Sequence, residues 1–176
     1  MGEPKGREAR RGRKGEGGAP GGAPPAPEPA LDYTLLVDVA APPARVWETL
    51  TADINRWWDP GFLTIPGSRG FRAEWRPGGL VVERGPEGDD GLVWFQVLGV
   101  RREQSLLLAG DLSPAYGGPA RLLTEFRLEE RSGGTRVTLR ETAHGAAGAA
   151  TRRSLEEGWT HLLGNRLKAA AEEPGS

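Results

Sequence analysis

The final helix of the chain constrains the fold more than any other segment. Its apolar residues recur at the spacing of one helical face, and together they form a stripe: Leu155, Trp159, Leu162, Leu163, Leu167 and Ala170. A long amphipathic helix must bury such a stripe against a large apolar surface. Because the preceding chain is rich in strand patterns, a β-sheet supplies that surface. We therefore expect an α+β fold in which a curved sheet wraps around one long C-terminal helix.

Strand patterns occupy most of the chain before this helix. Apolar and polar side chains alternate over residues 31–40, and six more strands are predicted at 71–76, 80–84, 92–100, 105–111, 121–130 and 135–142. Short polar or glycine-rich links join the last six strands, which indicates hairpins. The prediction is an antiparallel sheet of about seven strands.

Two short helices are expected between the first and second strands, over residues 41–50 and 52–58. Proline suits the first turn of the earlier helix, because its missing amide hydrogen would have no partner there. The final helix starts between residues 147 and 154 and ends near Ala171. Ser154 and Glu157 have the spacing of a capping box, but residues 151–153 fit the helix equally well.

Residues 1–30 differ in composition from the rest. They contain eight glycines and six prolines and almost no large apolar side chains, so they cannot offset the entropy lost on ordering. We expect a disordered tail at 1–30, one domain at 31–172 and a disordered end at 173–176.

The tail carries a net charge of +2 and the whole chain −1, which leaves −3 on residues 31–176. A slightly acidic domain is a poor nucleic-acid surface, because phosphate binding needs clustered Lys and Arg.

Cysteine is absent from the sequence, which excludes disulfides, thiolate metal sites and cysteine nucleophiles. Neither an export signal nor an apolar run of membrane-spanning length is found. These features predict a cytoplasmic protein that does not insert into membranes.

Three segments carry a resemblance to a known family. They are the proline-bearing helix start at 41–47, the Trp57-Trp58 pair and the closing Glu-Gly-Trp-Thr-His-Leu-Leu-Gly-Asn-Arg-Leu at 157–167. The chain resembles the START-like (SRPBCC) superfamily, and most of all its bacterial branch related to the activator of the heat-shock chaperone ATPase. The resemblance implies a helix-grip fold with an elongated apolar cavity. Members bind hydrophobic molecules, some are polyketide cyclases or dehydratases, some are co-chaperones, and a related group sequesters antibiotics.

Aromatic and apolar side chains at inward positions are candidates for the wall of such a cavity. Flat, rigid aromatic rings suit hydrophobic ligands. The predicted ligand-binding residues are Trp57, Trp58, Phe71, Trp75, Trp94, Phe126, Glu141, Trp159 and Leu163. The same apolar residues would also serve as an ordinary packed core. The inward face of residues 92–100 is left open, because both faces are apolar.

Glu141 is the polar member of this set, since it continues the inward phase of Val137 and Leu139. Burial would raise its pKa and suit it to anchor a ligand or accept a proton. If the strand frays near Thr142, Glu141 lies in water instead. The histidines, His144 and His161, are expected at a strand end and on the solvent side of the final helix, so no metal site is predicted.

These patterns favour a non-enzymatic protein that binds a small hydrophobic molecule, with no catalytic residues and no cofactor. One alternative is a cyclase or dehydratase that uses Glu141 with an arginine or Tyr116 for proton transfer. A co-chaperone that contacts a chaperone through its outer face and an antibiotic-sequestering protein are the others.

Overall fold

The computed structural model describes residue 2 and residues 30–173. The predicted tail at 1–30 and the predicted end at 173–176 lie almost entirely outside the described residues, so both stay predictions.

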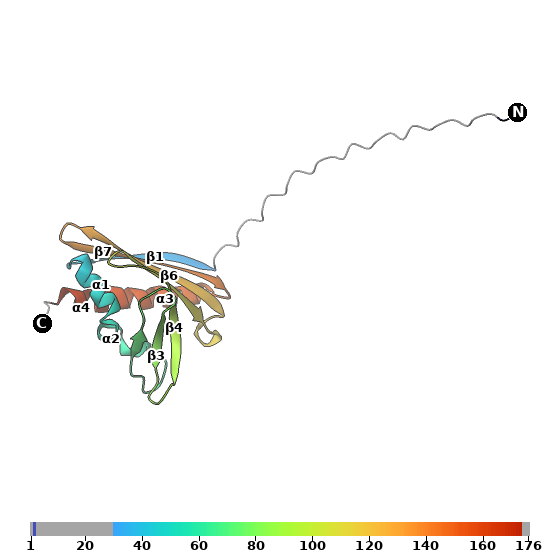
Figure 1. Cartoon of the computed structure of the whole chain (residues 1–176), viewed down its shortest axis with the longest axis horizontal. Coiled ribbons are helices and arrows are strands. Elements are labelled where there is room, and N and C mark those ends of the chain that lie inside the picture. Colours follow the sequence, from blue (N-terminus) through green and yellow to red (C-terminus); the bar gives the residue numbers. More distant parts are fainter. Residues whose placement is uncertain (1, 3–29, 174–176) are drawn as a thin grey trace.

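Seven antiparallel strands form one sheet in the order β1-β7-β6-β5-β4-β3-β2. Their bounds are β1 (Leu31–Val39), β2 (Phe71–Ala73), β3 (Leu80–Arg84), β4 (Gly91–Arg101), β5 (Ser105–Leu112), β6 (Ala120–Arg131) and β7 (Gly134–Gly145). Strands β2 to β7 are the predicted meander, and β1 pairs with β7 at the far edge. In Figure 1 the C-terminal helix runs under β1, β6 and β7 while β3 and β4 descend beside it. The helix-grip fold predicted from the sequence is confirmed.

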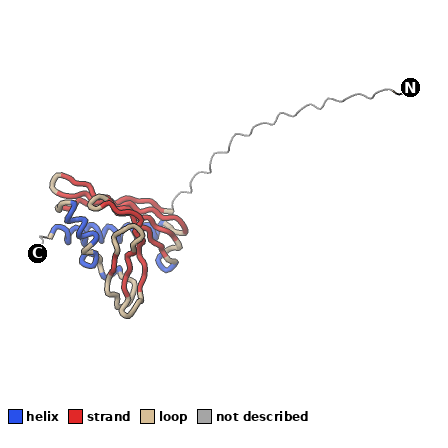
Figure 2. The backbone as a smooth tube through the Cα atoms, in the orientation of Figure 1, coloured by secondary structure: helices blue, strands red, loops and turns tan. Residues whose placement is uncertain are grey.

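The C-terminal helix is 24 residues long and has three parts: α3 (Ala149–His161), η3 (Leu162–Leu167), which has π-type hydrogen bonding, and α4 (Lys168–Glu172). It starts directly after Gly148, so Ser154 lies inside the helix and the capping-box alternative is wrong. The short helices are α1 (Pro43–Thr51), α2 (Ile54–Trp57), η1 (Pro60–Phe62) and η2 (Pro114–Tyr116). Figure 2 shows these short helices lying on the same side of the sheet as the long one.

The core lies between the sheet and the C-terminal helix. Alternate residues of β6 and β7 point into it, including Phe126, Val137 and Leu139, and Leu163 and Leu167 meet them from η3. All five are at most 2% exposed. The alternation of the sequence therefore identified the inner face of both strands correctly.

Strand β4 breaks its alternation at two bulges. Val81 and Val82 lie opposite Phe95 and Val93, so Trp94 is an extra residue between them. A second register shift falls between Val97 and Gly99. A bulge bends its strand and redirects a side chain, and the bulge at Trp94 allows the adjacent rings of Trp94 and Phe95 both to join the core. The bulges therefore explain why alternation over residues 92–100 does not identify a single inward face.

Strand β2 ends three residues earlier than predicted. The amide of Glu74 donates to the carbonyl of Leu80 at 3.0 Å, and the amide of Gly79 donates to the carbonyl of Arg76 at 2.8 Å. These bonds close a tight turn in which the chain leaves the ladder after Ala73. Trp75 consequently lies in the turn, where its Nε1 donates to the carbonyl of Thr51 at 3.0 Å.

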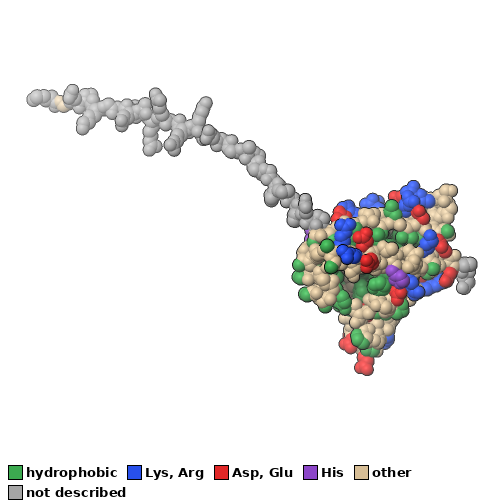
Figure 3. Space-filling view, turned by 180° about the vertical axis from the view of Figure 1, so that it is seen from behind, with side chains coloured by type: hydrophobic (Ala, Val, Ile, Leu, Met, Phe, Trp, Pro, Cys, Tyr) green, Lys and Arg blue, Asp and Glu red, His purple; other side chains and the backbone are tan. Residues whose placement is uncertain are grey.

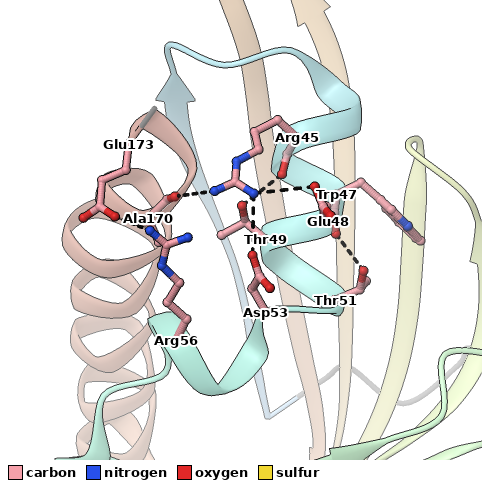
Figure 4. A network of polar contacts seen from close by, with 9 residues as sticks. All are labelled: Arg45, Trp47, Glu48, Thr49, Thr51, Asp53, Arg56, Ala170 and Glu173. Carbon is pink, nitrogen blue, oxygen red and sulfur yellow. Dashed lines mark hydrogen bonds and ion pairs between the residues drawn. The ribbon is translucent and has the colours of Figure 1, made fainter. Parts of the chain in front are cut away.

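A polar network fastens the short helices to the end of the long one (Figure 4). The guanidinium of Arg45 lies 3.5 Å from Glu48 and 3.6 Å from Asp53, and it donates to the carbonyl of Ala170 at 3.2 Å. Arg56 pairs with Glu173 beside it. These contacts connect α1 and α2 to α4.

Acidic and basic side chains intermingle on the surface, with apolar ones exposed between them (Figure 3). On the outer face of the sheet, Arg136 pairs with Asp38 at 2.8 Å and Arg140 with Asp32 at 2.7 Å across β1 and β7. Exposed pairs of this kind contribute about 0–1 kcal/mol each. Within the described residues, the helices are too short or too polar to cross a membrane.

Candidate ligand-binding cavity

A cavity of about 730 Å³ lies between the first half of the C-terminal helix and the sheet. Its wall comes from the segment after α2, from β4 and the end of β5, from single residues of β6 and β7, and from α3. The lining residues are Trp58, Gly61, Phe62, Leu63, Thr64, Leu92, Val93, Trp94, Phe95, Gly110, Asp111, Leu112, Ser113, Ala115, Tyr116, Leu122, Glu141, Thr151, Ser154, Leu155, Gly158, Trp159 and Leu162. Cavities of roughly 300–1,000 Å³ hold small organic molecules.

Four aromatic rings form the inner wall. Trp58 makes edge-on contacts with Trp94 and Trp159, at ring-centre distances of 5.2 and 5.8 Å. Phe95 lies 6.3 Å from Trp94 and 6.4 Å from Trp159. The two contacts of Trp58 are edge-to-face and those of Phe95 are tilted, and aromatic pairs at such distances attract one another beyond the burial of their area.

The structure divides the predicted ligand-binding residues into two groups. Trp58, Trp94, Glu141 and Trp159 line the cavity. The others lie outside its lining: Trp57, Phe71, Phe126 and Leu163 are buried in the core, and Trp75 is half-buried in the β2–β3 turn. Phe71 and Phe126 support the wall from behind, with ring centres 5.1 Å from Trp58 and 5.5 Å from Trp159. The role of all nine in binding stays a prediction.

Glu141 lies at the inner end of the cavity and is 1% exposed. Tyr33 on β1 and Thr124 on β6 stand directly opposite it in the sheet. Its carboxyl group accepts from Tyr33 Oη, from Thr124 Oγ1 at 2.8 Å and from Trp159 Nε1 at 3.2 Å. Burial raises the pKa of Glu141 and outweighs these three donors. The strand does not fray here, because the pairing of β7 continues to Gly145.

Glu83 is a second buried carboxylate, and it was not among the predicted residues. It is 0% exposed, and it accepts from Trp94 Nε1 at 2.8 Å, from Thr64 Oγ1 at 2.9 Å and from the amide of Ile65 at 2.8 Å. The amide of Thr64 also donates to it, at 3.0 Å. Although burial raises the pKa of Glu83, these donors outweigh burial and lower it. The signal in the sequence was its position two residues after the buried Val81, which places both side chains on the same face of β3.

The segment from Asp59 to Ile65, here called the strap, forms one side of the cavity. Glu83 holds its end, as described above. At its start, Asp59 Oδ2 accepts from His161 Nε2 at 2.8 Å, and this bond lowers the pKa of Asp59. Phe62 of the strap lies beside the ring of His161, with ring centres 5.9 Å apart. The expectation that His161 points into solvent is therefore only partly correct, because the strap covers that side of the helix while the His161 side chain stays 39% exposed.

Exposed hydrophobic side chains surround the mouth of the cavity. Phe62, Leu92, Val93 and Tyr116 line it and are 38%, 41%, 51% and 55% exposed. Clustered exposed apolar residues are uncommon on monomeric proteins and often mark a binding site. The mouth is therefore an apolar route from solvent to the aromatic wall.

Ionisable groups around the cavity are few and acidic. In the part of the chain that the structure describes, the lining contains no Lys, Arg or His, and its carboxyl groups belong to Glu141 and Asp111. Asp111 is exposed at the rim and pairs with Arg121 at 3.1 Å. Tyr116 is at the mouth, and none of the arginines that the structure describes lines the cavity to assist Glu141 in proton transfer. The described residues contain no group of three or more His, Asp or Glu able to hold a metal ion.

A seven-stranded antiparallel sheet closed over a long helix, with a cavity between them, is the architecture of the START-like superfamily. Within that superfamily, the chain belongs to the family described as Activator of Hsp90 ATPase homolog 1-like protein, whose model matches residues 40–172. The branch suggested by the sequence resemblance is therefore confirmed. No curated protein matches the chain significantly.

Several solved structures share this fold. A protein from Chromobacterium violaceum has 18% identity and a TM-score of 0.58, over 81% of this chain and 98% of its own. CalU16 from Micromonospora echinospora has 20% identity and a TM-score of 0.56, over 81% and 76%. DynU16, from the dynemicin biosynthetic locus, has 21% identity and a TM-score of 0.60, over 81% of this chain and 47% of its own. At these identities the similarity establishes a common fold.

Proposed function

We propose that this protein binds a small hydrophobic molecule reversibly and does not transform it. The observation that carries this proposal is the cavity of about 730 Å³ walled by Trp58, Trp94, Phe95 and Trp159. The exposed apolar side chains at its mouth supply a path for such a molecule. A cytoplasmic location, expected from the sequence, is part of the same proposal.

The polar groups of the cavity favour binding over catalysis. Both oxygens of Glu141 already accept hydrogen bonds, from Tyr33, Thr124 and Trp159. Oε1 accepts two of these bonds and Oε2 accepts one, so the carboxyl group keeps little capacity to accept a substrate proton. These donors instead hold Glu141 as a fixed part of the wall, which supports a binding role.

A neutral fluorescent probe, N-phenyl-1-naphthylamine, tests the proposal. Its emission rises when it enters an apolar site, so titration of the protein should give a saturable increase. Gly158→Leu should abolish this increase, because Gly158 lines the cavity. A Cβ atom at this position would lie 3.4 Å from the ring of Phe62, so the leucine side chain would extend toward that ring.

Gly164→Leu is the matched control. Gly164 belongs to the same long helix but is not part of the lining, and nothing lies within 4 Å of its Cβ position. The control should bind the probe like the wild type. Equal binding by both variants, or no saturable binding by the wild type, would refute the proposed function.

A further inference from the structure

Two of the tryptophans that line the cavity share one polar arrangement. Trp94 Nε1 donates to Glu83 at 2.8 Å, and Trp159 Nε1 donates to Glu141 at 3.2 Å. Both glutamates are at most 1% exposed. Within residues 30–173, neither carboxyl group forms an ion pair with a basic side chain. Each of the two indole rings is thus joined at its N–H edge to a buried carboxyl group that has no balancing cation.

This arrangement makes the ring faces attractive to positive charge. The face of an indole ring carries partial negative charge and attracts cations within about 6 Å. A carboxylate that accepts the indole hydrogen bond polarises the ring further, because hydrogen-bonded groups in a low-dielectric interior reinforce one another. The effect is strongest at Trp94, because hydrogen bonds lower the pKa of Glu83, whereas burial raises the pKa of Glu141 beside Trp159.

The surrounding charges do not cancel this preference. Among residues 30–173, no Lys, Arg or His belongs to the lining. At the rim, Arg121 pairs with Asp111, and on α3 Arg152 pairs with Glu156 at 3.6 Å. An anionic ligand would therefore find no counter-charge in the lining and two carboxyl groups behind the aromatic wall.

We propose that the cavity selects hydrophobic cations, such as an amine or quaternary ammonium group on an apolar body, over neutral and anionic molecules of the same shape. The proposal rests on the proposed function, since it names the charge class of the ligand for the same cavity. The positive group would lie against Trp94 and Trp159, and the apolar body would extend toward the mouth.

Three probes that share a naphthyl body and carry a positive, neutral or negative end group test this selectivity. They are naphthylethyl trimethylammonium, its carbon isostere with a tert-butyl group, and naphthylpropionate. Each is measured by displacement of N-phenyl-1-naphthylamine at neutral pH and low salt. The cation should bind about tenfold more tightly than the isostere, and the anion should bind most weakly.

Two variants separate ring polarisation from general hydrophobicity. Trp94→Phe keeps an aromatic wall but removes the N–H donor to Glu83, so the cation should lose most of its advantage while the isostere keeps its affinity. Trp47→Phe, which lies outside the lining and is not one of the predicted ligand-binding residues, should change neither.

Each outcome has one meaning. Equal binding of the cation and the isostere, tighter binding of the anion, or an unchanged cation advantage in Trp94→Phe would overturn the charge selectivity and leave the proposed function intact. Absence of binding by all three probes and by N-phenyl-1-naphthylamine would overturn both.

Discussion

The two buried glutamates show how the local environment sets the ionisation of a residue. Burial raises the pKa of Glu141, because its three donors do not compensate for lost hydration. Glu83 is equally buried, but amide, hydroxyl and indole donors lower its pKa below the ordinary value. Glu83 is thus ionised at neutral pH, whereas the pKa of Glu141 is raised above its ordinary value.

Replacing Glu141 by Gln should change the pH dependence of stability. The raised pKa means that the folded protein binds the proton more tightly than the unfolded chain, so Glu141 favours folding most at low pH. As pH rises from about 4 through the raised pKa, the wild type should lose stability relative to Glu141→Gln, by about 1.4 kcal/mol for each unit of upward shift. Urea unfolding midpoints between mildly acidic and neutral pH measure this difference. A difference that is independent of pH would contradict the burial of an ionisable Glu141.

Replacing Glu83 by Gln should have the opposite pH dependence. A lowered pKa stabilises the fold above the ordinary glutamate value near 4.3, and this contribution is lost as pH falls through the lowered pKa. At neutral pH the variant should be less stable by about 2 kcal/mol, because its amide group cannot accept from all the donors that face the carboxylate. The same urea series measures it, and a loss that grows on acidification would refute the assignment.

At single residues, the sequence predicted the direction of a side chain correctly where the alternation of the strand was enough to decide it. Glu141 shares the phase of Val137 and Leu139, so its inward position followed from alternation. Glu83 has the same relation to Val81, but its donors come from Thr64, Ile65 and Trp94. Their approach depends on the path of the strap and on a bulge, which local patterns do not reveal. Tyr33, which donates a hydrogen bond to Glu141, lies on β1, 108 positions away in the sequence.

Among the elements, the strap and the C-terminal helix determine the shape of the cavity. The strap is held at Asp59 by His161 and at Thr64 and Ile65 by Glu83. Between these points it presents Gly61, Phe62 and Leu63 to the cavity. Removing either attachment should therefore loosen this wall without unfolding the sheet.

Asp59→Ala tests the first attachment. The variant loses the bond from His161 and the bond from the amide of Gly61 at 2.9 Å. Amide hydrogen exchange in the strap should accelerate several-fold while exchange in β6 and β7 stays unchanged, because local opening does not require global unfolding.

Asp89→Ala, in the exposed turn between β3 and β4, is the control and should leave strap exchange unchanged. Unaltered strap exchange in Asp59→Ala would show that the His161 contact does not hold this wall.

Most elements were predictable because their patterns are periodic. All seven strands and the long helix were expected from the sequence, although β2 ends three residues earlier than predicted. The π-type turn at 162–167 and the β4 bulge at Trp94 were not predictable, since each inserts a residue into a pattern that reads as regular. Both irregularities lie beside the cavity, where Leu162 and Trp94 contribute to its wall.

At the scale of the whole molecule, one sheet and one helix leave a space that their side chains do not fill. The aromatic residues predicted for the cavity divide between its wall and the packed core, because the strand pattern gives the inward direction but not the distance from the helix. Family membership and fold agree with a ligand-binding domain. Occupancy of the cavity is accordingly the claim on which the account depends.

The six tryptophans provide the most direct measurement of that claim. Their indole N–H signals can be followed by NMR while N-phenyl-1-naphthylamine is added. Trp58, Trp94 and Trp159 line the cavity, whereas Trp47, Trp57 and Trp75 do not. Large, saturable shifts confined to the first three are predicted. Shifts that are largest at Trp47 or Trp75, or no shifts at saturating probe, would contradict the account.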